Sequence, residues 1–259
     1  MDFETIRYNK GSGRGIVVFN RPDKLNALNR KVFEELTIIF QEMEKDPEVK
    51  VVILTGGVDL FGAGADIQML SNMKSSAECY IFSGENSAYP ILENLGKPTI
   101  ASIGGFCLGG MLELALCCDF RIAADNAQFG LPEVKLGVLP GGGGTQRLPR
   151  LIGMTKAKEL VFMGDFIDGP EAYRLGLVNM VVPKDQLEAE TDKFAKRLMS
   201  RPPFGLRVIK GVMNAGINTP LKEGLEIERQ GFTILFSTED KKEGMAAFIE
   251  KRKPKFVGQ

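Results

Sequence analysis

The sequence predicts an α/β protein whose strands pair mostly in parallel. Short apolar runs at residues 16–19, 49–55 and 99–103 alternate with longer segments whose apolar side chains recur at helical spacing. Strands separated by helices are typical of parallel sheets, because a parallel partner is reached only by a long crossover connection. A chain of 259 residues is long enough for one large domain, or for a core with a smaller appendage.

Each element of the first half has a local signal. The strand at residues 16–19 ends before Pro22, and Asn29 is a suitable N-cap for an amphipathic helix that continues to residue 44. The near-continuous apolar run at residues 49–55 predicts a strand buried on both faces. We then expect, in order, a loop at 56–66, a long helical region at 67–95, a strand at 99–103, a helix at 109–118 and a strand at 120–124.

Beyond residue 184 the pattern is purely helical, with breaks at the proline pair 202–203 and at Pro220. Helices are expected at residues 185–199, 204–215, 221–236 and 239–253. A helical tail after an α/β core suggests a module for packing or assembly. Its basic end, residues 251–255, is either a solvated helix end or an anion-binding cluster, and both alternatives stay open.

The composition excludes several classes of function. Basic and acidic residues both number 33, so a net charge of zero favours neither nucleic acid nor a membrane as the main partner. The N-terminus lacks the pattern of a secretory signal, and no apolar run approaches the length of a membrane-spanning helix. Without histidine or C-x-x-C spacing a Cys/His zinc site is excluded. We expect a cytosolic protein with four buried free cysteines: Cys79, Cys107, Cys117 and Cys118.

The glycine clusters do not match the common phosphate-binding motifs. Neither residues 11–13 nor residues 141–144 complete G-x-G-x-x-G, and no G-x-x-x-x-G-K-[ST] motif is present. There is no G-x-S-x-G sequence, and a Ser–His–Asp triad is impossible without histidine. A nucleotide cofactor held by one of those phosphate-binding motifs is therefore not expected.

Two other glycine segments can present backbone N–H groups to a ligand. Gly109 and Gly110 begin an apolar helix, where the first N–H groups lack partners within the helix. The turn at residues 62–66 opens another helix, with Asp66 as its expected N-cap. Two N–H groups that converge on one point form an oxyanion hole. The alternative, that these glycines only allow close packing, stays open at this stage.

Two glutamates are the candidate acid–base groups. Glu113 lies three residues after Gly110 among apolar neighbours, where an unpaired carboxylate would be costly unless it has a function. Glu133 follows Pro132 in a loop-like segment, and taken alone it is better explained as an exposed loop residue. Asp119 has a simpler explanation as a helix-end residue.

Five segments carry a family resemblance: residues 20–28, 62–67, 104–119, 129–147 and 241–248. In this order they resemble the crotonase (enoyl-CoA hydratase/isomerase) superfamily over nearly the whole chain. The resemblance implies an α/β, crotonase-like spiral of ββα turns over residues 1–195, which carries an acyl-CoA site. It also implies a C-terminal helical region, residues 196–259, that assembles the protein as a trimer or a dimer of trimers.

The same resemblance assigns site residues. Ala65 and Gly110 would supply the two N–H groups that bind the thioester carbonyl, and Gly141 would help to place the water. Coenzyme A would contact one set of residues in this chain and two from a neighbouring subunit. The first set is Lys24, Leu25, Ala63, Asp66 and Ile67, and the second is Phe248 and Lys251.

Members with both glutamates resemble the hydratases, which add water across a trans-2-enoyl-CoA. Glu133 would donate a proton to Cα, while Glu113 would hold the water. No metal or redox cofactor is implied, since coenzyme A is part of the substrate. Three alternatives stay open: double-bond isomerisation, hydration of a cyclic dienoyl-CoA, and a non-catalytic member that binds acyl-CoA or RNA. The acyl chain length depends on residues 67–89, whose placement the sequence does not predict.

Overall fold

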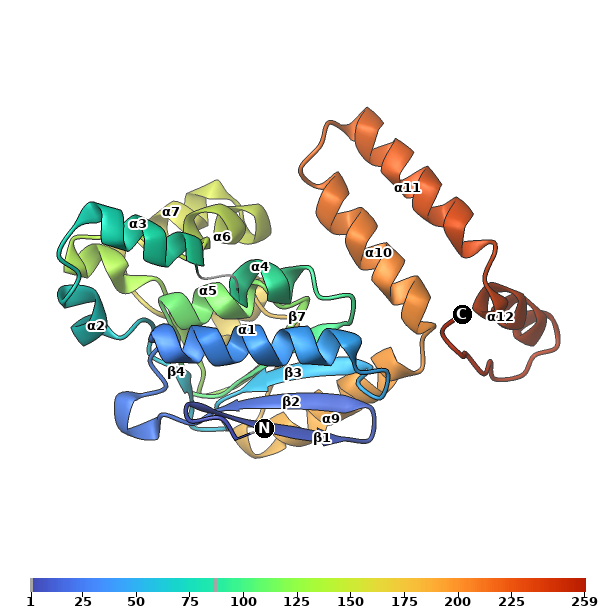
Figure 1. The fold of residues 1–259 in the computed structure, drawn as a ribbon, viewed down its shortest axis with the longest axis horizontal. Coiled ribbons are helices and arrows are strands. Elements are labelled where there is room, and N and C mark those ends of the chain that lie inside the picture. The colour runs from blue at the N-terminus through green and yellow to red at the C-terminus, as the bar shows by residue number, and fades with distance from the viewer. Residues whose placement is uncertain (1, 86–87) are drawn as a thin grey trace.

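A six-stranded sheet forms the centre of the fold in the computed structural model, which describes residues 2–85 and 88–259 (Figure 1). Its strands are, in spatial order, β1 (Ile6–Gly11), β2 (Arg14–Phe19), β3 (Val51–Thr55), β5 (Thr99–Ile103), β7 (Phe120–Ala124) and β10 (Met180–Val182). β1 and β2 are antiparallel, and every other neighbouring pair is parallel. The predicted parallel pairing is confirmed.

A second, four-stranded sheet consists of very short strands. They are β4 (Leu60–Gly62), β6 (Phe106–Leu108), β8 (Gln128–Gly130) and β9 (Ile167–Asp168), of which only β9 is antiparallel to its neighbour. β4, β6 and β8 each follow a strand of the large sheet within a few residues, and helices follow in turn. This repeat is the expected spiral of ββα turns. The sequence did not predict these strands, because two or three residues show no periodicity.

The helices α1 (Arg30–Lys45) and α5 (Gly110–Leu116) lie close to their predicted positions. Asn29 caps α1 by accepting a hydrogen bond from the Val32 N–H, as predicted. The single long helical region predicted at 67–95 is wrong. The structure has α2 (Ile67–Ser71), α3 (Ser76–Glu85) and α4 (Ala88–Glu93) there. A new helix starts because the Ser75 hydroxyl accepts from the Glu78 N–H; residues 86–87 lie outside the described part.

The remaining helical segments are shorter. They are the 3-10 helices η1 (Pro22–Lys24), η2 (Pro132–Leu136) and η3 (Lys184–Gln186), and the α-helices α6 (Gly144–Ile152), α7 (Met154–Met163) and α8 (Gly169–Arg174). Glu133 therefore lies on a 3-10 helix, not in an irregular loop.

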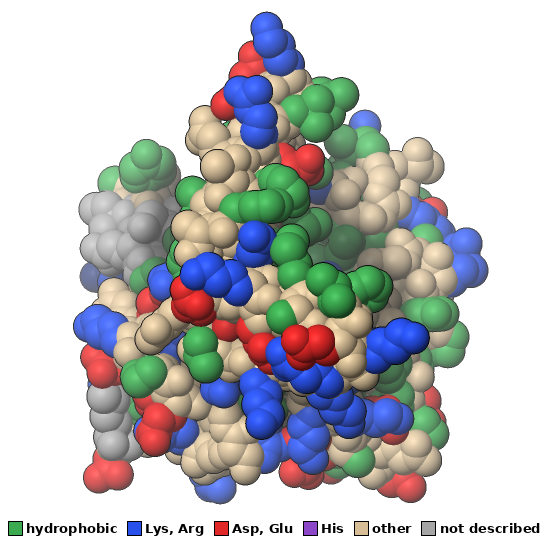
Figure 2. Space-filling view, turned by 90° about the vertical axis from the view of Figure 1, so that its right-hand side faces the viewer, with side chains coloured by type: hydrophobic (Ala, Val, Ile, Leu, Met, Phe, Trp, Pro, Cys, Tyr) green, Lys and Arg blue, Asp and Glu red, His purple; other side chains and the backbone are tan. Residues whose placement is uncertain are grey.

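The C-terminal helices are α9 (Leu187–Met199), α10 (Pro203–Gly216), α11 (Leu221–Leu235) and α12 (Glu239–Ile249), so the last ends before residue 253. Leu187 and Ala195 of α9 pack on the large sheet, whereas α10 and α11 extend away from the body (Figure 1). The division at residue 195 falls inside α9 and stays a prediction. Figure 2 shows hydrophobic side chains exposed on this part. The large apolar residues exposed on and between α10 and α11 include Met213, Ile217, Leu221, Leu225 and Phe232.

Three of the four cysteines are buried, but Cys79 on α3 is exposed, so its predicted burial is wrong. α3 has little amphipathic character, and its neighbour Tyr80 is also exposed. Among the helices of the described residues, none has an apolar stretch long enough to span a membrane.

Candidate active site

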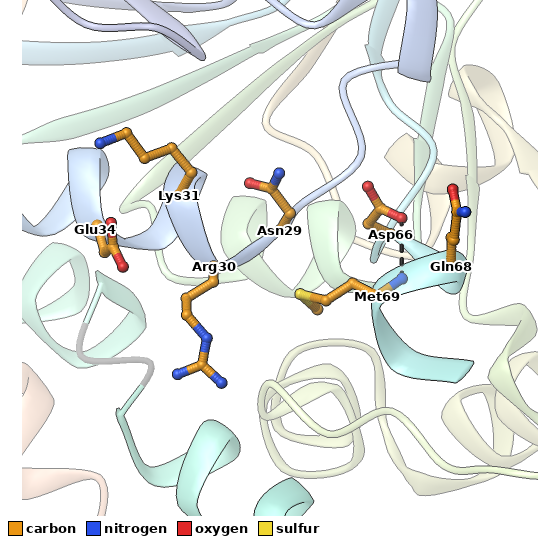
Figure 3. Close-up of a pocket in the computed structure, with 7 residues that line it drawn as sticks. All are labelled: Asn29, Arg30, Lys31, Glu34, Asp66, Gln68 and Met69. Atoms are coloured by element: carbon orange, nitrogen blue, oxygen red, sulfur yellow. Dashed lines mark hydrogen bonds between the residues drawn. The ribbon is translucent and has the colours of Figure 1, made fainter. Parts of the chain in front are cut away.

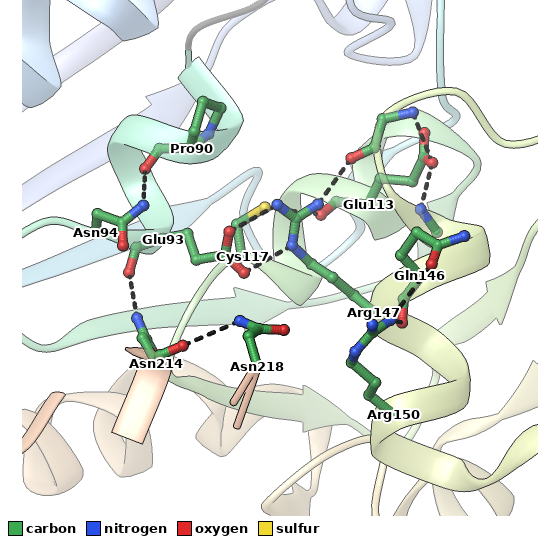
Figure 4. Close-up of polar contacts among 12 residues, drawn as sticks. Pro90, Glu93, Asn94, Glu113, Cys117, Gln146, Arg147, Arg150, Asn214 and Asn218 are labelled. Carbon is green, nitrogen blue, oxygen red and sulfur yellow. Dashed lines mark hydrogen bonds and ion pairs between the residues drawn. The ribbon is translucent and has the colours of Figure 1, made fainter. Parts of the chain in front are cut away.

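Glu113 is buried on α5, and within the described residues its carboxyl group accepts hydrogen bonds only from backbone N–H groups. Its Oε1 accepts hydrogen bonds from Gly142 at 2.8 Å and from Gly144 at 2.7 Å, as Figure 4 shows. Burial raises the pKa of this carboxyl, and the two N–H groups lower it because they stabilise the charged form. An added Cβ at Gly142 would approach Glu113 Oε2 to 2.7 Å. The same Cβ would lie 2.7 Å from Tyr89 Cζ, so a side chain at position 142 would displace Glu113 or Tyr89.

Glu133 lies against the start of the same helix. An added Cβ at Gly109 would meet Glu133 Oε1 at 3.0 Å. Glu133 Oε2 is buried and has no hydrogen-bond partner within residues 2–85 and 88–259. Burial, together with the Glu113 charge, raises the Glu133 pKa to about 7. The interpretation of Glu133 as an exposed loop residue is wrong, because η2 turns the side chain inward.

The backbone of Ala65 and Gly110 comes together at the N-terminus of α5. A Cβ placed on Gly110 would lie 3.7 Å from the Ala65 nitrogen. Gly64 permits this approach with a φ of +109°, a value that L side chains rarely adopt. Neither N–H donates to an acceptor in the described part of the chain. The arrangement thus offers two free donors beside the two carboxyl groups, which suits an oxyanion.

Tyr89 of α4 closes one side of this site and was missed by sequence reasoning. Its hydroxyl donates to the Gly110 carbonyl at 3.2 Å. Burial first, and then the charge of Glu113, raises the Tyr89 pKa well above its usual range. The side chain therefore stays neutral. No sequence signal marks this tyrosine, because it lies in an otherwise ordinary helix.

Arg147 of α6 joins the glycine loop to α4 (Figure 4). Its Nη1 donates to the Gly142 carbonyl at 3.0 Å. Its Nε and Nη2 form a two-point contact with the Glu93 carboxylate at 2.8 and 2.7 Å. The Glu93 carbonyl in turn accepts from Asn214 Nδ2 on α10 at 3.1 Å. The sequence placed Arg147 in a motif but assigned it no role.

The residues expected to bind coenzyme A in this chain lie on two adjacent segments. The Leu25 carbonyl accepts from the Ala63 N–H at 3.0 Å, and the Asp66 N–H donates to the Leu28 carbonyl at 2.8 Å. Asp66 caps α2 as predicted, through the Met69 N–H. Leu25 and Ile67 expose about half of their surface, 52% and 50%, and Lys24 is exposed. These residues therefore form one edge beside the two donors, exposed at Lys24, Leu25 and Ile67 and half-buried at Ala63 and Asp66.

A cavity of about 470 Å³ lies next to Asp66 (Figure 3). It is lined by Asn29, Arg30, Lys31, Glu34, Asp66, Gln68 and Met69. Among the described residues, no group of three or more Cys, Asp and Glu side chains is placed to hold a metal ion.

Three further predicted site residues make no hydrogen bond to Glu113 or Glu133 in the described part of the chain. Phe248 lies on α12 with 86% of its surface exposed, and Lys251 follows the same helix. α12 lies at the far end of the C-terminal region from α5 (Figure 1). Gly141 is exposed in the glycine loop, where the hydrogen bonds to Glu113 come from the glycines that follow it. The roles of these residues stay predictions.

Comparison with known sequences decides the family. The family model described as enoyl-CoA hydratase/isomerase matches residues 10–259. The chain belongs to the enoyl-CoA hydratase/isomerase family. It is 42% identical over 260 residues to a crotonyl-CoA hydratase of Syntrophomonas wolfei, with 100% of both chains covered. It is 43% identical to a short-chain-enoyl-CoA hydratase of Clostridium acetobutylicum, covering 98% of this chain and 97% of the relative.

Solved structures of this enoyl-CoA hydratase/isomerase family have the same fold. An enoyl-CoA hydratase from Bacillus anthracis aligns with a TM-score of 0.94 at 38% identity, over 99% of this chain and 100% of that one. A protein from Geobacillus kaustophilus described as an enoyl-CoA hydratase subunit aligns with a TM-score of 0.95 at 42% identity, over 100% of both chains. The predicted crotonase-like fold and the family resemblance are confirmed.

Proposed function

We propose that this protein adds water to a short-chain trans-2-enoyl-CoA to form the 3-hydroxyacyl-CoA. The observation that carries the proposal is the pair of carboxyl groups, Glu113 and Glu133, beside two N–H donors that have no acceptor among the described residues. A hydration needs one group to accept a proton from water and one to deliver a proton to carbon. The printed names of the relatives from Syntrophomonas wolfei and Clostridium acetobutylicum support this reaction class.

The substrate would be bound through its thioester and its coenzyme A. The thioester carbonyl oxygen would accept hydrogen bonds from the N–H groups of Ala65 and Gly110. Coenzyme A would lie along the edge that carries Lys24, Leu25 and residues 63–67. This placement puts the double bond next to the carboxyl groups. No cofactor is needed apart from the coenzyme A of the substrate.

The reaction proceeds by syn addition, in which one carboxyl group accepts a proton and the other donates one. Glu113 Oε2 accepts a proton from water as the water oxygen bonds to Cβ. The carbonyl oxygen gains negative charge, which the N–H groups of Ala65 and Gly110 stabilise. Glu133 then delivers its proton to Cα, and the enolate returns to the thioester. Transfer of the proton from Glu113 to Glu133 restores the starting state, and one water between the two carboxyls would allow them to share these roles.

In the decisive assay the purified protein is incubated with crotonyl-CoA, and the absorbance of the thioester and the mass of the product are measured. We expect the absorbance of the conjugated thioester to fall and a product that is heavier by one water, with turnover highest for short acyl groups in a series of enoyl-CoA lengths. A product of unchanged mass would indicate isomerisation, and tight binding without turnover would indicate a non-catalytic member. Either result would overturn the proposal.

The raised Glu133 pKa predicts a stability effect that is independent of the assay. A carboxyl whose pKa is about 7 in the folded state stabilises the fold fully below pH 4.5, and this stabilisation is lost as the pH rises to 7. Glu133→Gln removes the ionisation. At pH 8 the free energy of unfolding of the variant should be about 1–2 kcal/mol higher than that of the wild-type protein. This is less than the free energy that corresponds to the whole pKa shift, because the group is partly solvated. Urea denaturation at pH 8 and pH 4.5 measures this difference.

The matched control for that measurement is Glu188→Gln, since Glu188 is exposed on α9. It should match the wild-type protein at both pH values. A Glu133→Gln variant whose gain is the same at pH 4.5 and pH 8 would contradict the raised pKa.

The assembly follows as part of the same proposal. Exposed apolar side chains on α10 and α11 support a homo-oligomer, a trimer or a dimer of trimers, since large apolar side chains grouped on a surface commonly mark an interface. Phe248 and Lys251 would then reach coenzyme A bound to a neighbouring subunit. A cytoplasmic setting stays a prediction that rests on the free cysteines.

A further inference from the structure

The loop that holds Glu113 has little stiffness of its own. Residues 141–144 are four consecutive glycines, and Gly143 has a φ of +106°. Glycine loses more conformational freedom on folding than other residues, so the loop needs external contacts to keep one conformation. Its conformation matters because Gly142 and Gly144 position Glu113 through their N–H groups.

Arg147 supplies such a contact from the helix that follows the loop. One arm of its guanidinium donates to the Gly142 carbonyl, on the same residue whose N–H binds Glu113. The other arm and Nε bind both carboxylate oxygens of Glu93. A planar fork held at two points has a defined orientation, which a single-point ion pair lacks. Glu93 therefore determines where Arg147 places the Gly142 carbonyl.

Glu93 is itself anchored. It is the last residue of α4, the helix that carries Tyr89, and its carbonyl accepts from Asn214 of α10. The Arg147 side chain lowers the Glu93 pKa, so this carboxylate stays charged. The contact thus connects α6 to α4 and to the C-terminal helices.

The groups that face Glu113 come from four elements. Cys117 lies on the same helix, Tyr89 on α4, Glu133 on η2 and Arg147 on α6. Arg147 is the cation of this set, and its charge lowers the Glu113 pKa, against the effect of burial. Arg147 therefore acts on Glu113 in two ways: through its charge, and through the hydrogen bond that places Gly142.

We propose that Glu93 and Arg147 are positioning residues that keep the glycine loop, residues 141–144, hydrogen-bonded to Glu113. The two-point contact holds Arg147, Arg147 holds the Gly142 carbonyl, and the N–H groups of Gly142 and Gly144 then hold Glu113 Oε1. In this proposal neither side chain has a role in binding the substrate. The inference rests on the proposed function only in treating Glu113 as the proton acceptor.

The test compares Glu93→Gln and Arg147→Lys with the wild-type protein by two independent readouts. Amide hydrogen exchange of residues 141–146 reports the N–H bonds to Glu113 without any substrate. Steady-state hydration of crotonyl-CoA between pH 5 and pH 9 reports the function. Lysine keeps the charge of Arg147 but cannot bind Glu93 and Gly142 in one planar fork.

We expect both variants to exchange the loop amides about 10-fold faster, with exchange in β3 unchanged. kcat should fall about 10-fold, because small misplacement of a reacting group is costly, and KM should change less than about 2-fold. The acidic limb of the kcat profile should shift in both. The controls are Glu171→Gln and Arg174→Lys, whose exposed two-point contact on α8 has the same geometry; they should change neither readout.

Loop exchange and kcat that match the wild-type protein in both variants would overturn the proposal. So would faster exchange that extends equally to β3, because that result indicates a general loss of stability. If the wild-type protein does not hydrate crotonyl-CoA, the proposed function fails, whereas the loop exchange still decides whether Glu93 and Arg147 position Glu113.

Discussion

Replacing Glu113 or Glu133 by glutamine should lower kcat for crotonyl-CoA hydration by about 10²–10⁴-fold, the usual contribution of a positioned acid or base. Glutamine keeps the size of the side chain but can neither accept the proton from water nor deliver one to Cα. At position 113 the amide oxygen can still accept from Gly142 and Gly144, so the loop should keep its place. The loss of absorbance of the conjugated thioester measures the rate.

The double variant should lose little more than the worse single variant, since the two groups act on one proton cycle. Glu188→Gln is the surface control and should keep full activity.

The pH profile of kcat separates the two roles. A proton donor with a pKa of about 7 must be protonated, so wild-type kcat should fall as the pH rises above about 7. The residual activity of Glu133→Gln should lack this fall. Near-wild-type rates in either single variant would contradict the assignment.

Removal of one N–H donor at the start of α5 should also lower kcat strongly. Gly110→Pro deletes the N–H at the first helical position, where proline is compatible with a helix. We expect kcat to fall by about 10²–10³-fold, because one hydrogen bond to the developing enolate oxygen is lost. Single-turnover kinetics with crotonyl-CoA measure the chemical step directly.

Gly110→Ala is the matched control for this variant. It adds the same Cβ, 3.3 Å from Leu28 Cδ1 and Tyr89 Oη, but keeps the N–H. The rate ratio of the proline to the alanine variant therefore isolates the hydrogen bond. Equal rates in both would show that crowding, not the donor, accounts for the loss. Thermal melting of both variants checks that α5 still packs.

Local patterns predicted the larger elements and one half of the site. The cap at Asn29, the buried strand β3 and the start of α5 follow from residue types within a single turn or strand. The apolar neighbours of Glu113 indicated an unusual carboxyl before any contact was known. In contrast, the strands of the small sheet are too short to show a period, and the break before α3 depends on one hydroxyl at Ser75.

Other features needed contacts between distant segments. Glu133 taken alone favoured an exposed position, yet η2 places its carboxyl group against the start of α5 with Oε2 buried, and this burial raises its pKa. Tyr89 and the Glu93–Arg147 contact had no sequence signal at all. A bidentate pair separated by 54 residues depends on how α4 and α6 pack, which is a property of the whole spiral.

The residue types and their order were therefore sufficient for the family, the class of fold and the identity of two carboxyl groups in a chain without histidine. The chemistry of those carboxyl groups was not contained in their local surroundings. Glu113 is held by N–H groups from a loop 29 residues away, and Glu133 is desolvated by a helix that precedes it in the chain. A pKa depends on burial and on neighbouring charges, and both arise only when the ββα turns stack and bring these segments together.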